Sequence, residues 1–146
     1  MKGLELAAGK LCVSASVANG LTANVYAGSG FNVNGDKDKI ECPAVVCFVE
    51  TREQLYPDTD NFRIEVASLV VQVQEKASQT DFTSSLERVT HGAFTRNDNI
   101  ESTLTTMSSG SVSVLKLRKV TKRNNFDESD RTWTYESSFE FIAVEN

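Results

Sequence analysis

Large, mostly aromatic side chains alternate with polar ones over the last sixteen residues, RTWTYESSFEFIAVEN, numbered 131–146. One phase of this alternation carries Trp133, Tyr135, Phe139 and Phe141, and Ser137 interrupts it. Successive side chains of a β-strand point to opposite faces, so strict alternation is typical of a strand with one buried face. We therefore expect the aromatic side to lie in the core of a sheet. The other side carries Thr134, Glu136, Ser138 and Glu140.

The rest of the chain shows further strand and helix patterns. Alternation or short apolar runs predict strands within residues 21–29, 40–50, 62–76 and 111–122. Changes of phase predict a β-bulge at 67–70 and another near Val114. Apolar residues at helical spacing predict helices within residues 4–18, 81–92 and 99–107. We expect Asp81 to cap the second helix and Gly92 to end it.

Polar stretches between these elements predict loops. The segment GSGFNVNGDKDK, residues 28–39, contains an Asn-Gly pair that is typical of a tight turn. TREQLYPDTDN, residues 51–61, is expected to be a turn-rich loop, and KRNNFDESDR, residues 122–131, a polar hairpin turn. The element order predicts a single α+β domain. Its mostly antiparallel sheet of about four to five strands packs against an N-terminal helix and a central helical segment.

Composition narrows the class of partner. The 146 residues carry a net charge of -5, which disfavours general attraction to nucleic acid or to an anionic membrane. Apolar runs are too short to span a bilayer. Charged and hydroxyl residues interrupt the N-terminal apolar stretch, so we read it as part of the fold and not as a signal peptide.

The residues most often used in catalysis or metal binding are sparse. Cys12, Cys42 and Cys47 lack metal-ligand spacing and are expected to be free, mostly buried thiols. His91 is the one histidine, and its place near an expected helix end favours a helix-dipole contact or a surface position over catalysis. The acidic stretch at residues 127–130 lacks the spacing of a calcium loop. We expect no metal, no cofactor and no enzymatic activity.

One strand is basic and its expected hairpin partner is acidic. The segment LKLRKVTKR, residues 115–123, includes Lys116, Arg118 and Lys119, and the partner strand includes Glu136 and Glu140. These charges can pair across the two strands of one subunit, which contributes a few tenths to about 1 kcal/mol for each pair. Alternatively, the basic patch of one subunit can meet the acidic patch of the next and close a ring. Both readings stay open, and they do not exclude each other.

The pattern and order of these elements resemble the small tail-terminator (tail-completion) proteins of long-tailed bacteriophages and related neck proteins. The matching pieces are LELAAGKLCVSASVA, the loop GSGFNVNGDKDK leading into ECPAVVCFVE, FRIEVASLVVQVQEK followed by DFTSSLERV, and SVSVLKLRKV with WTYESSFEFIAV. The resemblance covers nearly the whole chain. It implies an N-terminal helix, a hairpin with a long loop, a long strand followed by a helix, and a closing strand pair.

The resemblance also implies a function. The protein would be a structural component of the virion neck that forms a ring, six-fold in the family, on the head-proximal end of the tail tube. Its partners would be itself, the tail-tube protein and the head-connector proteins. The expected docking loops contain Phe31, Asn34, Asp36, Lys37, Asp38 and Lys39 in the first, and Arg123, Asn124, Asn125, Phe126 and Asp127 in the second.

Two alternatives remain. The chain can be another virion part, such as a head-completion stopper or a tube-like protein. It can also be a small enzyme or ligand-binding domain with a pocket between helix and sheet, lined by Trp133, Tyr135 and Phe139. Aromatic residues on one face of a strand are more often simple core.

Overall fold

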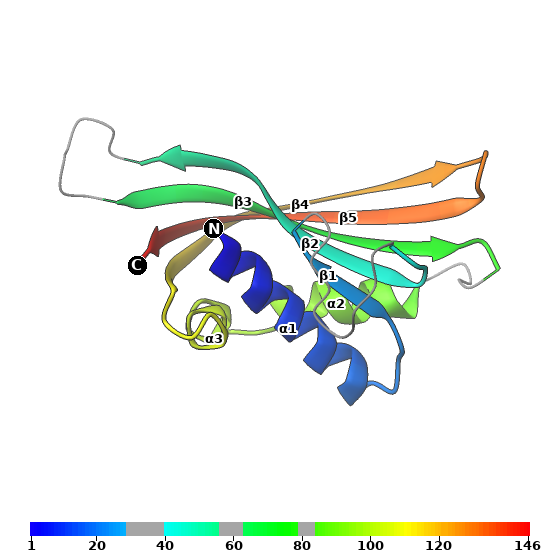
Figure 1. The fold of residues 1–146 in the computed structure, drawn as a ribbon, viewed down its shortest axis with the longest axis horizontal. Coiled ribbons are helices and arrows are strands. Elements are labelled where there is room, and N and C mark those ends of the chain that lie inside the picture. The colour runs from blue at the N-terminus through cyan, green and yellow to red at the C-terminus, as the bar shows by residue number, and fades with distance from the viewer. Residues whose placement is uncertain (29–39, 56–62, 79–83) are drawn as a thin grey trace.

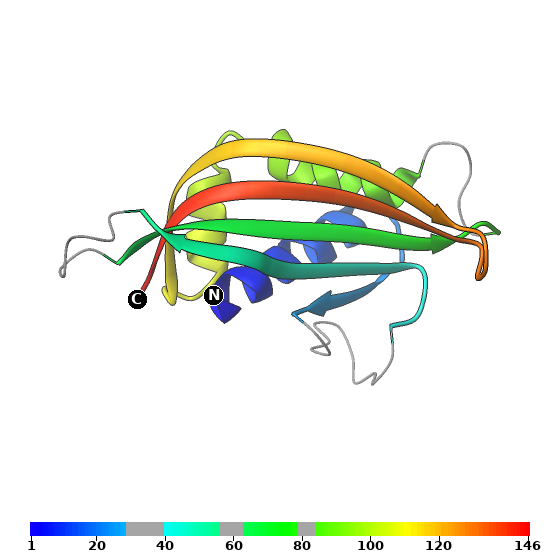
Figure 2. The same ribbon diagram turned by 90° about the horizontal axis from the view of Figure 1, so that it is seen from above.

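The computed structural model describes residues 1–28, 40–55, 63–78 and 84–146. In chain order the elements are α1 (Lys2–Ala18), β1 (Asn24–Ala27), β2 (Ala44–Gln54), β3 (Ile64–Lys76), α2 (Ser85–Thr95), α3 (Ile100–Met107), β4 (Val112–Asp127) and β5 (Thr132–Glu145). The helices lie together on one side of the sheet, as Figures 1 and 2 show. The predicted α+β domain with a mostly antiparallel sheet is confirmed.

Within the described ranges, the five strands lie in the order β1-β2-β3-β5-β4. Neighbours pair antiparallel except β1 and β2, which run parallel with Val25 level with Val45. The hairpin that the resemblance implied for these two strands is therefore wrong. Residues 28–43 join them, which is more than the dozen or so residues that a parallel connection needs.

The main core lies between the helices and the sheet. Small residues of α1 such as Ala7 and Ala8 are fully buried and let this helix approach the strands closely. On β5, Phe139 and Phe141 are fully buried, as the alternation predicts, and Phe94 of α2 stacks on Phe139 with ring centres 4.6 Å apart. Trp133 and Tyr135 are only half-buried, because the far end of β5 runs on past the helices (Figure 1).

The other face of the sheet, here called the open face, is covered by none of the described helices (Figure 2). Toward the β1 edge it holds a small apolar cluster in which Tyr26 packs with Ala44, Val46 and Phe48. Toward the β4 edge it is polar. The polar residues of this half include Gln72 of β3, Thr121 and Arg123 of β4, and Glu136, Ser138 and Glu140 of β5.

Several strand boundaries differ from the expected ones. β2 begins after Pro43 and continues through residues 51–54, which were expected to form a loop. The expected bulge at 67–70 is wrong, because β3 pairs with β5 without interruption and the extra residue is Glu50, opposite on β2. The bulge near Val114 is confirmed, and a second follows between Leu117 and Lys119. The turn expected at 122–131 is also wrong, since β4 extends to Asp127.

Both ends of α2 differ from the ends predicted from the sequence. Ser84 caps α2 by accepting a hydrogen bond from the backbone N–H of Glu87 at 3.1 Å, and Asp81 lies outside the described residues. The helix passes through Gly92 and ends at Thr95, so the prediction that Gly92 ends it is wrong. Packing of Leu86 and Phe94 against the sheet outweighs the cost of about 1 kcal/mol for an internal glycine. α3 buries Ile100 and Leu104 on one side, as predicted.

Candidate interaction surfaces

Ion pairs cross from β4 to β5 on the open face. The guanidinium of Arg118 lies 3.2 Å from the carboxylate of Glu140, and Arg123 pairs with Glu136. The side-chain amide of Gln72 donates to the same Glu136 carboxylate at 3.0 Å. Burial raises the pKa of Glu136, but the hydrogen bonds from Gln72 and Arg123 outweigh it, so the pKa is lowered. The prediction that these charges pair within one subunit is confirmed for these two pairs.

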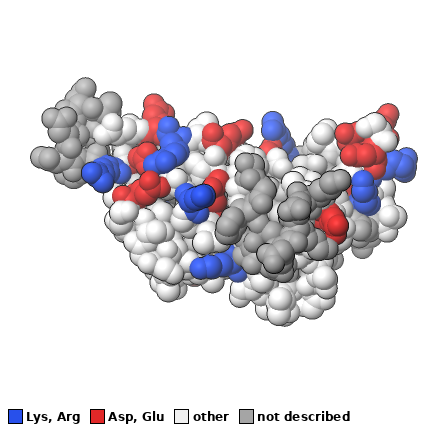
Figure 3. Space-filling model, in the orientation of Figure 1, with Lys and Arg blue, Asp and Glu red and all other residues white. Residues whose placement is uncertain are grey.

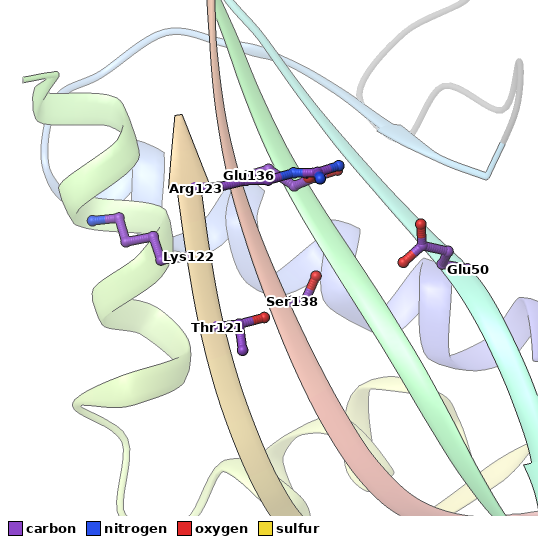
Figure 4. A pocket seen from close by; sticks show the side chains of 6 residues that line it. All are labelled: Glu50, Thr121, Lys122, Arg123, Glu136 and Ser138. Carbon is purple, nitrogen blue, oxygen red and sulfur yellow. The ribbon is translucent and has the colours of Figure 1, made fainter. Parts of the chain in front are cut away.

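The pair between Arg123 and Glu136 lies at the centre of a shallow polar trough (Figure 4). A hollow of about 250 Å³ is lined by Glu50, Thr121, Lys122, Arg123, Glu136 and Ser138. A neighbouring hollow of about 460 Å³ is lined by Gln72, Arg123, Asn124, Asn125, Thr134 and Glu136. Lys122 points toward α2, where it pairs with Glu87. The trough therefore presents hydrogen-bonding groups. The two charges at its centre, on Arg123 and Glu136, neutralise each other.

Two lysines of β4 are not paired in the way that Arg118 and Arg123 are. Lys116 and Lys119 are exposed, and neither makes an ion pair with any residue in the described ranges. Five residues were expected at a subunit interface. Three of them, Arg118, Glu136 and Glu140, form ion pairs within the subunit, and the two lysines form none with a described residue. Whether any of them meets another subunit stays a prediction.

The expected docking residues fall into two groups. Phe31, Asn34, Asp36, Lys37, Asp38 and Lys39 lie outside the described residues. Arg123, Asn124, Asn125, Phe126 and Asp127 were expected in a loop, and they belong to β4 because each pairs with a residue of β5. The hairpin turn is confined to residues 128–131.

An aromatic stack stiffens the end of this hairpin. The ring of Phe126 lies 4.7 Å from that of Trp133, which stacks on Tyr135 at 6.0 Å, and the guanidinium of Arg131 lies over Phe126 at 5.8 Å. At the turn, Ser129 donates two hydrogen bonds to the carboxylate of Asp127 and lowers its pKa. These contacts pack the tip of the hairpin, and Tyr135 joins the stack to the main core. The sequence signal was Phe126 itself, an aromatic residue inside an otherwise polar stretch.

His91 belongs to α2 and faces the sheet, which corrects the expected surface or helix-end position. Its Nδ1 lies 2.9 Å from the Oγ of Ser137 on β5. Burial lowers the pKa of His91, and the charge of Lys122 adds to this effect, so the neutral imidazole is favoured. A histidine and a serine at this distance can form a base–nucleophile pair. Ser137 is 4% exposed, however, and its Oγ is closed off from a substrate beneath α2.

The cysteines are free thiols, as expected. Cys12 on α1 and Cys47 on β2 are fully buried with their sulfur atoms 3.9 Å apart, and Cys42 is half-buried. The hydrogen bond from Cys12, together with burial, raises the pKa of the Cys47 thiol well above its usual value, which makes this sulfur a poor nucleophile.

In the described parts of the chain, no three His, Cys, Asp or Glu side chains gather at a metal-binding distance. None of the described helices is long and apolar enough to cross a membrane.

A charge cluster that the sequence did not suggest lies at the other end of the sheet. The amino group of Met1 pairs with Glu145 at 2.9 Å, and this contact lowers the pKa of the Glu145 carboxyl. Arg52 approaches the same carboxylate at 3.6 Å and also pairs with Glu65 at 2.6 Å. The cluster ties the start of α1 to β2, β3 and β5. The pairing depends on strand register, which the sequence pattern did not reveal.

Comparison with known proteins does not assign a family. The sequence matches no protein-family model and none of the curated proteins. Function is therefore inferred from the surfaces described above.

Proposed function

We propose that this protein is a structural subunit of a tailed-bacteriophage virion. In this proposal it is a tail terminator, which forms a ring on the head-proximal end of the tail tube and takes part in the head–tail connection. One observation carries the proposal. The β2–β3 and β4–β5 pairs run past the helices in opposite directions (Figure 1). A terminator needs a contact surface on each side, because it must hold the tube below and the connector above.

The two projecting ends differ in chemistry, which also supports the proposal. Acidic and basic side chains lie side by side near both projecting ends (Figure 3), so the sign of charge does not distinguish the ends. The tip of the β4–β5 hairpin carries the packed rings of Phe126 and Trp133. At the other end, Arg52 is held between Glu65 and Glu145. A ring that binds a tube subunit on only one side needs unlike ends, because matching ends would let the tube continue to grow.

The exposed surface suits a subunit that stays soluble until it assembles. Among the described residues, the exposed large apolar side chains are Val17, Ile40, Leu115 and Val120. They are scattered, and isolated apolar side chains do not make a sticky patch. Polar ends and edges can then bind partners of matching charge without exposing the core. The same features fit another neck protein, such as a head-completion stopper, which is the nearest alternative.

An enzyme is the second candidate, and the contact between His91 and Ser137 is the observation that favours it. The burial of Ser137 argues against it. The ligand pocket expected between helix and sheet has no support from these residues either. Phe139 is fully buried in the core, and neither of the two hollows described above is lined by Trp133 or Tyr135.

Light scattering of the purified protein at micromolar concentration tests the proposal. We expect an oligomer of ring size, or assembly when the tail-tube protein of the same virus is added. A protein that stays a monomer under both conditions would rule out the proposed function. Serine-directed fluorophosphonate labelling provides the opposing test. Labelling that disappears in Ser137→Ala would favour the enzyme.

A further inference from the structure

Four aliphatic side chains lie together on the open face near the end of β5, and we call them the aliphatic patch. They are Ile64 and Val66 of β3 and Ile142 and Val144 of β5, which pair across the two strands. The next residue along β5 from Ile142 is Phe141, which points into the main core, so the patch faces the other way. All four are only half-buried, and they pack against neither of the two apolar clusters described above. None of the described helices covers this face (Figure 2).

Side chains of opposite charge flank the aliphatic patch. In the strand register, Lys116 of β4 is paired with Ile142, and Glu53 of β2 is paired with Val66. Directly paired residues share a face, so Lys116 and Glu53 lie level with each other on the open face, with the patch between them. Both side chains are exposed, and neither forms an ion pair with a described residue.

A second pair of opposite charges lies at the next level along the strands. Lys119 of β4 is paired with Glu140 of β5, and the same row continues through Ser68 to Thr51 of β2. Glu50 is the extra residue of the bulge before Thr51, and it lines the trough, so it also belongs to the open face. Lys119 and Glu50 are exposed and form no ion pair with a described residue either.

The other charges at these two levels are already paired. Arg118 pairs with Glu140 on the open face. Arg52 is level with Ala67 of the main core and therefore lies on the helix side, where carboxylates of β3 and β5 hold it. The β4 side of the open face is thus basic at these levels, and the β2 side is acidic.

A two-fold axis parallel to the strands makes this surface complementary to itself. When a second copy is turned about an axis above the line between β3 and β5, its β4 lies over β2 of the first copy, and its β5 lies over β3. This rotation leaves heights along the strands unchanged. Lys116 of each copy then faces Glu53 of the other, and Lys119 faces the bulge that carries Glu50. Sheets packed face to face are about 10 Å apart, a gap that a lysine and a glutamate side chain span together.

Charge disfavours the other two-fold arrangement of two open faces. An axis that runs across the strands would lay β4 over β4 of the second copy and β2 over β2. Lysines would then face lysines, and glutamates would face glutamates. Like charges placed opposite each other are destabilising, so the axis along the strands is favoured.

We propose that the open face binds the open face of a second copy of this chain, with Lys116 and Lys119 of each copy facing Glu53 and Glu50 of the other. The two aliphatic patches form the centre of the contact and the charges form its rim, an arrangement typical of protein interfaces. Each copy uses the same surface, so the contact closes at two chains. It goes beyond the proposed ring, because a ring needs a repeating contact between unlike surfaces.

Charge reversal tests the contact in sedimentation-velocity measurements over a range of protein concentrations. One variant carries Lys116→Glu and Lys119→Glu, and the other carries Glu50→Lys and Glu53→Lys. In a pair of identical variants like charges face each other, so we expect the dissociation constant of the pair to rise about tenfold or more. An equal mixture of the two variants brings an acidic face against a basic one and should form pairs as readily as the wild type. A variant with all four changes exchanges the signs and should also pair.

Two further variants complete the experiment. Lys2→Glu with Arg88→Glu is the matched control, because both are exposed helix residues outside the open face, and it should pair as the wild type does. Lys116→Gln with Lys119→Gln removes the attraction without repulsion and should weaken the pair less than the reversal does. Circular dichroism is expected to show that all variants remain folded.

The outcomes separate this contact from the ring. Loss of the pair in each reversal variant, with recovery in the mixture, supports the contact. A wild type that forms no pairs, or reversal variants that pair at the wild-type concentration, would overturn it. Failure of the mixture to pair would also count against it. Ring-sized assemblies that all variants form alike would overturn the contact and leave the proposed ring intact.

Discussion

Replacing Phe139 by alanine removes the centre of the aromatic strand face. The side chain is fully buried, stacks on Phe94 at 4.6 Å and lies 6.4 Å from the ring of Phe141. Burial of a phenylalanine contributes about 1.5–3 kcal/mol, and an aromatic pair adds about 0.5–1.5 kcal/mol. The cavity left behind brings the expected loss to about 3–5 kcal/mol. This is a large fraction of the roughly 5–15 kcal/mol by which a domain of this kind is stable.

Urea denaturation followed by circular dichroism measures this loss. Trp133→Ala is the informative comparison, because Trp133 belongs to the same strand face but is only half-buried beyond the helices. We expect it to cost clearly less than Phe139→Ala. Phe139→Leu should lose less than the alanine variant, since leucine refills most of the space. A loss below about 1 kcal/mol for Phe139→Ala would refute the assignment of this face to the core and would favour a ligand-binding surface.

Three further predictions concern single contacts. Ser84→Ala should lower the free energy of unfolding by about 1–2 kcal/mol in urea denaturation, because the α2 cap and the contact with the buried Glu75 carboxylate are both lost. An unchanged midpoint would contradict the cap. The pKa of His91 is lowered in the folded state, so the unfolded chain binds the proton more readily and stability should fall as the pH drops below about 6.5. His91→Gln should show a smaller fall in melts between pH 7 and pH 5; an identical profile would assign the effect elsewhere. Glu145→Gln should cost less than about 1 kcal/mol, because the carboxylate that meets the Met1 amine is 44% exposed. A larger loss would indicate a tighter cluster at this end.

The alternation of the last strand predicted its structure well because one of its faces is buried. Where both faces of a strand are exposed, no such pattern remains. Residues 122–127 and 51–54 look like polar loops, and they are strands because β5 and β3 provide backbone partners. Tertiary pairing of this kind outweighs local preference. The change of phase at 67–70 marks no bulge in β3, which pairs with β5 without interruption. It arises because Ile64 and Val66 lie on the open face, whereas Leu69 and Val71 belong to the main core.

The candidate surface was predictable in part. The basic run on β4 was visible in the sequence, and so was the acidic character of β5. The strand register decides which of these charges pair. Arg118 and Arg123 form ion pairs with β5, and Lys116 and Lys119 form none with a described residue. The place of Glu50 beside the trough could not be foreseen, because it depends on the β-bulge between Val49 and Thr51.

Electron microscopy of the protein mixed with tail tubes of the same virus tests the central claim most directly. The proposal predicts closed rings with a central opening, and one ring layer on a single end of each tube. Bare tube ends, binding along the tube wall, or open filaments in place of rings would contradict it.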